Sequence, residues 1–413
     1  MPRLSRTTNK RYEHRTYYLV YRVFSMNLER GTPFENVYIF VADALRYDKL
    51  PESVASRWPV VQTISGGVSS PSGFTTLITG RYPPHHGVYR FTSRLPDHVW
   101  TVFDAFPNTS FHRNRGSLEN VLGITGSVED ADPTELEPPF VAIERDLVTH
   151  APFGERPEDE DQRFDGNRAY FSERRSRSTI VSEYEHASER AVERLEQRMA
   201  TLRERGLLDD TLVIFTADHG EILGEYGLMT HGSHVCPELV RVPTIFCTDE
   251  VTLDEQVISQ ADIVPTALSL AGRGGSTPVD ISGLDLTENA DRGRLMFAES
   301  RGIGYRHEWS AWDAEGGYIF TEDTVVDRLK WFYRQLGPSC SAPYSRHNLL
   351  EFLPVVFEGI LEGHRRVGNP NFDKAQAESF CADVFAGEVN EQRREITDEG
   401  RERLERLGYL DEL

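Results

Sequence analysis

Residues 211–220, with the sequence TLVIFTADHG, join a continuous apolar run to a polar end. The first six residues are rich in β-branched and aromatic side chains, which is typical of a strand buried on both faces of a parallel sheet. A second run of this kind, VYIFV at 37–41, leads to Asp43. Between the two runs, residues 180–205 place apolar side chains at helical spacing among Glu and Arg. Strand, helix and strand in this order predict an α/β fold with a mostly parallel central sheet flanked by helices.

The polar residues that follow these strands are candidates for chemistry. Asp43 and the pair Asp218-His219 stand at carboxyl ends of predicted strands, and a third strand candidate at 139–143 runs on to Asp146. Open α/β sheets bind ligands at this edge, because the carboxyl ends of parallel strands meet there. An Asp in such a place is also a common helix N-cap, so each residue taken alone is a weak signal.

A third candidate segment is SSPSGFTTLITG at 69–80, which begins with hydroxyl groups and continues as a helix. A hydroxyl group at a helix start meets free backbone N–H groups and the positive end of the helix dipole. Such a place binds a tetrahedral anion and favours an alkoxide. The alternative is that Ser70 only begins an ordinary helix.

Four segments taken together resemble the sulfatase domain of the alkaline phosphatase superfamily. They are TLVIFTADHGEILGEYG at 211–227, TLITGRYPPHHGV at 76–88, VTHAPF at 148–153 and SQADIVPTALSLAG at 259–272. The likeness spans roughly residues 35–300, and the segments occur in the order of that family. It implies an alkaline-phosphatase-like fold and a metal-dependent hydrolase or transferase that cleaves a phosphate or sulfate ester through a seryl covalent intermediate.

The resemblance also implies roles for individual residues. One divalent cation would be held by Asp43, Ser70, Asp218 and His219. Ser70 would be the nucleophile, because a bound cation makes its hydroxyl group more acidic. The groups that hold the nonbridging oxygens or protonate the leaving group would be His150, Arg81 and His231, with Arg46 as a weaker candidate.

The segment around Ser70 departs from the family pattern. Counting back from Thr79-Gly80 assigns the nucleophile to Ser70, whereas counting from the Pro-Ser pair assigns it to Ser69, and Ser72 is a third hydroxyl group nearby. No Cys is present in this segment, and the Arg of the sulfatase C/S-x-P-S-R signature is missing. We therefore expect no formylglycine.

The metal-binding positions depart as well. The chain has Asp43-Ala44 and Asp218-His219 where calcium-type sulfatases have Asp-Asp and Asp-Asn pairs. The imidazole moves the expected metal from Ca²⁺ towards Mn²⁺ or Zn²⁺, with Mg²⁺ and Ca²⁺ as alternatives, and favours phosphoryl chemistry. The alternatives are a sulfatase without formylglycine and an inactive relative that binds an anion.

A second metal is the other open question. Asp146 and His150 have the D-x-x-x-H spacing of two-metal members of the superfamily, and His231 would be the third ligand. Alternatively, His150 contacts only substrate. Of a site with one metal and a site with two, we prefer the site with one metal.

The sequence divides into three parts. Residues 1–34 form a basic, partly aromatic extension that we expect to pack on the domain, with a weak peripheral membrane contact as the alternative. Residues 35–300 form the catalytic domain, and residues 301–413 a mainly helical C-terminal region. No apolar run follows the early arginines and none reaches the ~18 residues that span a bilayer, so we expect a cytoplasmic protein.

Composition restricts the partners. The chain has 66 acidic and 45 basic residues, a formal net charge of −21 and only four lysines. This acidity argues against nucleic acid as a partner. It suits a protein that works in concentrated salt, although a GC-rich genome also favours arginine. The expected substrate is a small-molecule, glycan-linked or lipid-linked phosphate or sulfate ester.

Overall fold

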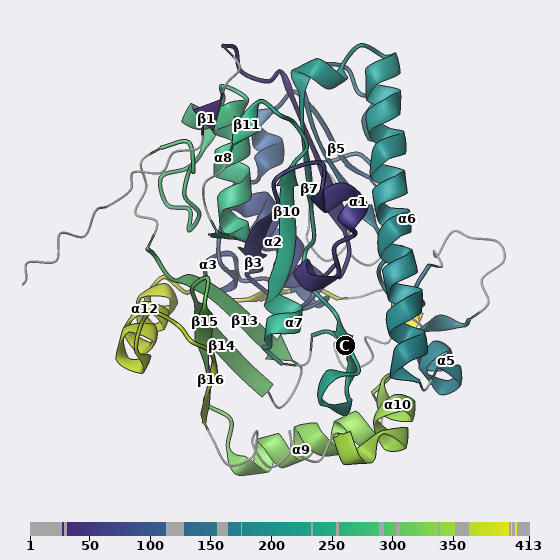
Figure 1. Ribbon diagram of the computed structural model, residues 1–413. Coiled ribbons are helices and arrows are strands. Elements are labelled where there is room, and N and C mark those ends of the chain that lie inside the picture. Colours follow the sequence, from purple (N-terminus) through teal and green to yellow (C-terminus); the bar gives the residue numbers. More distant parts are fainter. Residues whose placement is uncertain are drawn as a thin grey trace, which may run out of the picture.

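Figure 1 shows the computed structural model of the chain. The residues that it describes are 27–28, 31–112, 128–154, 164–174, 176–232, 234–252, 256–288, 293–302, 306–337, 339–351, 363–395, 398 and 401–402. Most of the predicted basic extension, with its suggested membrane contact, lies outside these residues. Within it, strand β1 (Asn27–Leu28) pairs with β11 (Val251–Thr252).

The central sheet confirms the predicted fold class. Its seven strands, in spatial order, are β12 (Val257–Ser259), β3 (Val61–Ile64), β10 (Arg241–Phe246), β7 (Thr211–Thr216), β2 (Asn36–Ala42), β6 (Phe140–Asp146) and β5 (Asn108–His112). All neighbours are parallel except β10, which is antiparallel to both β3 and β7. Strands β3, β7, β2 and β6 therefore end at the same edge of the sheet.

Helices cover both faces of this sheet, which explains the continuous apolar strands. Every residue of β2 and β7 is buried. Tyr38 and Phe40 of β2 belong to the core that includes the long helix α6 (Arg177–Glu204). The alternate residues Val37, Ile39 and Val41 belong to the core that includes α2 (Ser70–Thr79) and α8 (Ile263–Leu270). The two helical layers flank the sheet in Figure 1.

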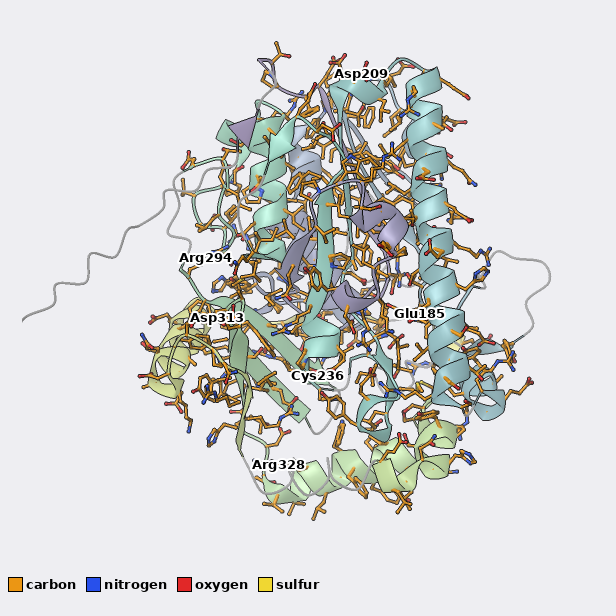
Figure 2. All side chains as sticks on the ribbon, in the orientation of Figure 1. Glu185, Asp209, Cys236, Arg294, Asp313 and Arg328 are labelled. Atoms are coloured by element: carbon orange, nitrogen blue, oxygen red, sulfur yellow. The ribbon has the colours of Figure 1, made fainter. Side chains whose placement is uncertain are left out.

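Helix α6 is amphipathic, as its sequence pattern predicts. Its buried stripe includes Ile180, Tyr184, Ala187, Ala191, Leu195 and Leu202. Its outer face carries charged side chains such as Glu185, which projects from the helix in Figure 2 and accepts a hydrogen bond from Lys49 Nζ at 2.6 Å. Burial of each aliphatic side chain stabilises this packing by about 1.5–3 kcal/mol.

The C-terminal region adds an unpredicted sheet to the helices that the sequence predicts for residues 301–413. A four-stranded antiparallel sheet is formed by β13 (Met296–Gly302), β14 (Arg306–Trp312), β15 (Gly316–Thr321) and β16 (His364–Gly368). Helices accompany it: α9 (Val325–Leu336), α10 (Ala342–His347) and α12 (Lys374–Ala386). The expected boundary would cut β13, whose residues pair along their whole length with β14.

This second sheet is held in place from both sides. Phe297 and Phe320 pack in one cluster with residues of α12, whereas Trp312 and Ile319 pack in another with residues of α9. The backbone N–H of Glu299 donates to the Gly66 carbonyl at 3.0 Å, which joins β13 to the loop before α2. The second sheet is thus attached to the edge where the candidate site lies.

Short elements complete the described chain. They are α1 (Glu52–Ala55), α3 (Pro83–His86), α5 (Gly166–Glu173), α7 (Pro237–Val240), β4 (Ser93–Arg94), β8 (Ile222–Leu223), β9 (Met229–Thr230) and β17 (Gln392–Arg393). Of the helices among the described residues, none combines the length and the apolar character needed to cross a membrane.

Candidate active site

The residues after β2 and β7 meet the start of α2. Asp43, Asp218 and His219 are fully buried, and one side-chain ligand atom from each lies within 4.8 Å of the others. The Ser70 hydroxyl group donates to Asp43 Oδ2 at 3.3 Å, and its oxygen lies 3.3 Å from His219 Nε2. The structure therefore brings together the four residues that the sequence predicted around one cation.

The two carboxylates each have one buried oxygen without a hydrogen-bond partner, Asp43 Oδ1 and Asp218 Oδ2. Their other oxygens are satisfied: Asp43 Oδ2 accepts from Arg145 Nε at 2.7 Å, and Asp218 Oδ1 accepts from the backbone N–H groups of Ala44 and His219 at 3.1 and 3.0 Å. A buried carboxylate oxygen without a partner carries a large desolvation cost. The free oxygens therefore fit a site for a cation.

The orientation of His219 supports the same fit. Its Nδ1 lies 2.8 Å from the Gly220 carbonyl oxygen, which can only accept, so in the neutral ring Nδ1 carries the proton. The lone pair of Nε2 is then directed at Asp218 Oδ2, 3.3 Å away, and at Ser70. Acceptors that face one another at this distance repel unless a proton or a metal cation lies between them. Two carboxylate oxygens, one imidazole nitrogen and one hydroxyl group suit a divalent metal cation.

The three candidate hydroxyl groups have different surroundings. Ser70 is the first residue of α2 and contacts Asp43 and His219. Ser69 precedes the helix, and its Oγ lies 3.2 Å from that of Ser72. Ser72 also donates to the Ser69 carbonyl at 3.0 Å. Of the three, Ser70 is the hydroxyl group that these contacts direct into the cluster.

His150 and His231 extend the cluster into a row of three imidazole rings. The ring centroids of His219 and His231 are 4.3 Å apart, and those of His231 and His150 are 5.0 Å apart. His150 Nδ1 lies 2.8 Å from the Ala151 carbonyl oxygen, and His231 Nδ1 lies 3.4 Å from the Glu221 carboxylate. Both rings lie beside the predicted metal ligands, as expected for groups that contact substrate.

Burial determines the charge state of these groups. It lowers the pKa of His150 to about 4 and holds that of His231 well below its ordinary value. Burial also raises the pKa of Asp218, and the nearby charge of Asp43 adds to the effect. For Asp43 burial acts in the same direction and is the largest single effect, but Arg145 together with the three neighbouring histidines outweighs it and the pKa falls. Both histidines are therefore neutral at pH 7.

Two residues of the site were not predicted from the sequence. Arg145 lies in β6, and its Nη2 donates to Ser70 Oγ at 3.2 Å in addition to the Asp43 contact. Glu221 is buried beside His231, and burial raises its pKa to about 7. The sequence did contain a signal for each residue. Arg145 belongs to a run of charged residues at the end of an otherwise apolar strand, and Glu221 directly follows Asp218-His219-Gly220.

The suggested second metal site is not assembled by the structure. Asp146 Oδ2 is paired with Arg194 of α6, and Oδ1 accepts from the Val148 N–H at 2.9 Å. Because successive residues of a strand point to opposite faces, Arg145 reaches Ser70 while Asp146 faces α6. Among the described residues, the one group of acidic, His and Cys side chains with metal-binding spacing is Asp43, Asp218 and His219.

The structure places Arg81 at the far end of α2 from Ser70. Arg81 follows Gly80, the residue that ends α2, so a helix of ten residues separates it from Ser70. Its guanidinium donates to the Asp280 carboxylate and carbonyl, each at 2.8 Å. Arg46, the weaker candidate, donates to Asp48 at 2.7 Å and to Glu225 at 2.9 Å.

Comparison with known proteins agrees with this geometry. Residues 134–273 match the sulfatase family. A low-salt glycan biosynthesis sulfotransferase of the halophile Haloferax volcanii is 28% identical over 413 aligned residues, covering 93% of this chain and 98% of that protein. The chain thus resembles the sulfatases over residues 134–273 and this sulfotransferase over most of its length.

Further relatives of this sulfatase-like protein are sulfatases. Arylsulfatase K of Danio rerio is 35% identical over 159 residues, a stretch that covers 37% of this chain and 28% of that protein. These relatives are named as a sulfotransferase and a sulfatase, and the chain has a sulfatase-family hydrolase or sulfotransferase-like function.

Solved structures share the fold of the sulfatase-like protein. A 2-O GAG sulfatase has a TM-score of 0.52 at 15% identity, covering 79% of this chain and 92% of that one. A phosphonate monoester hydrolase of Agrobacterium radiobacter has a TM-score of 0.52 at 17% identity, covering 79% of this chain and 96% of that one. At such low identity the likeness concerns the fold alone.

Proposed function

We propose that the chain transfers or hydrolyses the sulfuryl group of a glycan sulfate ester through a covalent ester on Ser70. The observation that carries the proposal is the set of acceptors around the Ser70 hydroxyl group: two unpartnered carboxylate oxygens and the Nε2 of His219. Asp43, Asp218 and His219, with Ser70, would hold one Mn²⁺ or Zn²⁺ ion. The cation would favour the alkoxide form of Ser70 and offset charge on the sulfate oxygens.

The reaction proceeds in two steps on the residues of the site. Ser70 Oγ attacks sulfur, and the bond between sulfur and the leaving alcohol oxygen breaks. The neutral ring of His231 gives that oxygen the proton of Nε2, while the Glu221 carboxyl group, whose pKa burial raises to about 7, passes its proton to Nδ1. An incoming hydroxyl group then attacks sulfur and releases Ser70. His150, whose Nδ1 donates to Ala151, accepts the proton of that hydroxyl group at Nε2.

A serine nucleophile suits transfer to an acceptor. A formylglycine hydrate can expel sulfate by forming its carbonyl group again, which releases free sulfate. A seryl sulfate lacks this route, so the group passes to an attacking hydroxyl group, either water or a sugar alcohol. The motifs alone favour phosphate esters. The likeness to a glycan biosynthesis sulfotransferase over 93% of the chain moves our preference to sulfate esters.

The test is a panel of aryl sulfates, aryl phosphates and phosphate diesters, each with Mn²⁺, Zn²⁺, Mg²⁺ or Ca²⁺ in high salt. We expect phenol release from aryl sulfate with Mn²⁺ or Zn²⁺. With an added saccharide acceptor, phenol should exceed free sulfate, because part of the sulfuryl group is transferred.

Other results would favour the alternatives. Phenol and sulfate in equal amounts with every acceptor would indicate a simple sulfatase. A preference for aryl phosphate would assign phosphoryl chemistry. One bound metal ion per chain without turnover of any ester would contradict an enzymatic function and favour an anion-binding relative.

A further inference from the structure

Arg145 is a buried cation that the proposed reaction does not yet use. It lies near the carboxyl end of β6, between Glu144 and Asp146, and only 8% of its surface is exposed. The two neighbours face α6, where Arg198 Nε donates to Glu144 at 2.9 Å and Arg194 pairs with Asp146. Strand alternation therefore directs Arg145 alone to the opposite face, towards α2.

The guanidinium of Arg145 donates hydrogen bonds to both Asp43 and Ser70, the proposed metal ligand and the proposed nucleophile. Nε donates to Asp43 Oδ2 at 2.7 Å, and Nη2 donates to Ser70 Oγ at 3.2 Å. A planar guanidinium holds two acceptors in a fixed relation, which an ammonium group does not. Since Oδ2 is occupied in this way, Asp43 has Oδ1 left for the cation, and this is the oxygen without a partner.

The chain has no room for a guanidinium on α2 itself. A Cβ atom at Gly73 would lie 2.4 Å from the Asp218 carbonyl oxygen, so a side chain cannot stand there. The next residue, Phe74, places its ring 5.6 Å from Arg145 Cζ. The guanidinium of Arg145, which comes from β6, thus lies over the first turn of α2. Arg46 and Arg81, the arginines predicted for the site, are instead paired with Asp48, Glu225 and Asp280.

We propose that Arg145 is a positioning residue that supplies the second positive charge of the site, in place of a second metal ion. It orients the Ser70 hydroxyl group and restricts Asp43 to one metal-binding oxygen. Two carboxylates balance a divalent cation, so the guanidinium balances the charge of the Ser70 alkoxide and keeps the site from repelling an anionic ester. This inference rests on the proposed function only in its expected effect on turnover.

The test compares Arg145→Gln and Arg145→Lys with the wild-type chain in three measurements. Calorimetric titration with Mn²⁺ should give one ion per chain in all three proteins, with affinities within about tenfold of one another. The kcat for aryl sulfate should fall by about 10²–10³-fold in Arg145→Gln and less in Arg145→Lys. Labelling of Ser70 by an aryl sulfonyl fluoride, followed by mass spectrometry, should slow in the same order.

The matched control is Arg194→Gln, which removes a guanidinium from the carboxylate at the neighbouring position of the same strand, on its other face. It should leave Ser70 labelling unchanged. If Arg145→Gln does not fold, the test uses two other variants. Ser70 labelling should be slower in Arg145→Lys than in the wild-type chain, and added guanidinium should restore Ser70 labelling in Arg145→Ala.

Three results would overturn the inference: two Mn²⁺ ions per wild-type chain, loss of Mn²⁺ binding together with activity in Arg145→Gln, or Ser70 labelling that is unchanged in Arg145→Gln. Labelling and Mn²⁺ binding need no turnover. Failure of the proposed function would therefore appear as absent turnover with these two readouts still in the expected order.

Discussion

At the scale of single residues, Ala44 shows how the strand end directs Asp43 into the site. Ala44 has a φ of 65°, in the left-handed region, which costs a non-glycine residue about 1–2 kcal/mol. Its N–H donates to Asp218 Oδ1 at 3.1 Å, and its carbonyl accepts from the Tyr184 hydroxyl group at 2.7 Å. These buried hydrogen bonds offset the strain and couple the end of β2 to the end of β7.

The nucleophile is the prediction that belongs to this scale. Ser70→Ala should lower kcat on an aryl sulfate by about 10⁴-fold or more, because Ser70 is the hydroxyl group that contacts Asp43 and His219. Ser69→Ala and Ser72→Ala are the matched controls, and we expect each to keep kcat within about tenfold. Thermal unfolding should be similar in all three variants. Activity retained in Ser70→Ala and lost in Ser69→Ala would move the nucleophile to Ser69.

At the scale of elements, the site depends on how closely α2 approaches the end of β7. The first turn of α2 packs on the Asp218 backbone, whose carbonyl accepts from the Ser65 hydroxyl group at 2.6 Å and from Gln260 Nε2 at 3.0 Å. Gly73 makes this approach sterically feasible, since a Cβ atom there would lie 2.4 Å from the same carbonyl oxygen. The packing of α2, β7 and the loop before α2 therefore sets the distance between Ser70 and Asp218.

Gly73→Ala tests this packing. The methyl group should push α2 away from β7, lower kcat/KM by about 10²-fold and reduce the free energy of unfolding by about 1–3 kcal/mol. The control is Gly275→Ala, because no atom lies within 4 Å of a Cβ atom at that glycine. It should change the unfolding free energy by less than about 0.5 kcal/mol. Equal kinetics in both variants would show that α2 is not held this tightly.

At the scale of the whole molecule, charge is divided between a paired interior and an acidic exterior. Buried carboxylates such as Glu144 and Asp146 have arginine partners on α6. The full chain has a net charge of −21, and Figure 2 shows Glu185 on α6 and Asp209 in the turn beyond its C-terminal end. Like charges on the surface repel one another at low salt, whereas salt screens buried pairs much less.

The melting temperature should therefore rise when KCl increases from about 0.1 M to about 2 M, since the screening length falls from about 10 Å to about 3 Å or less. Differential scanning fluorimetry measures the shift. Sucrose at equal osmolality is the control, because it favours the folded state without screening charge. A melting temperature that is constant or falls with KCl would contradict the view that surface repulsion limits the stability of the chain.

Local patterns in the sequence were sufficient for the central architecture. Continuous apolar runs at 37–41 and 211–216 predicted buried parallel strands, and strands that run in parallel must end at one edge. That rule places Asp43, Asp218 and His219 at one edge of the sheet, whereas their role as metal ligands came from the resemblance to sulfatases. Counting back from Thr79-Gly80 to the nucleophile position of that family gave Ser70, because spacing within a helix is regular.

Only the tertiary structure decided which side chains face the site. Arg145 and Asp146 are adjacent and equally plausible in sequence, yet the packing of α6 on one face of β6 and α2 on the other sends them in opposite directions. The antiparallel sheet β13–β16 was missed for a different reason: short connections join β13 to β14 and β14 to β15, but these strands lack the continuous apolar runs of β2 and β7. The direction of Arg145 depends on contacts between residues far apart in the chain, which no local pattern contains.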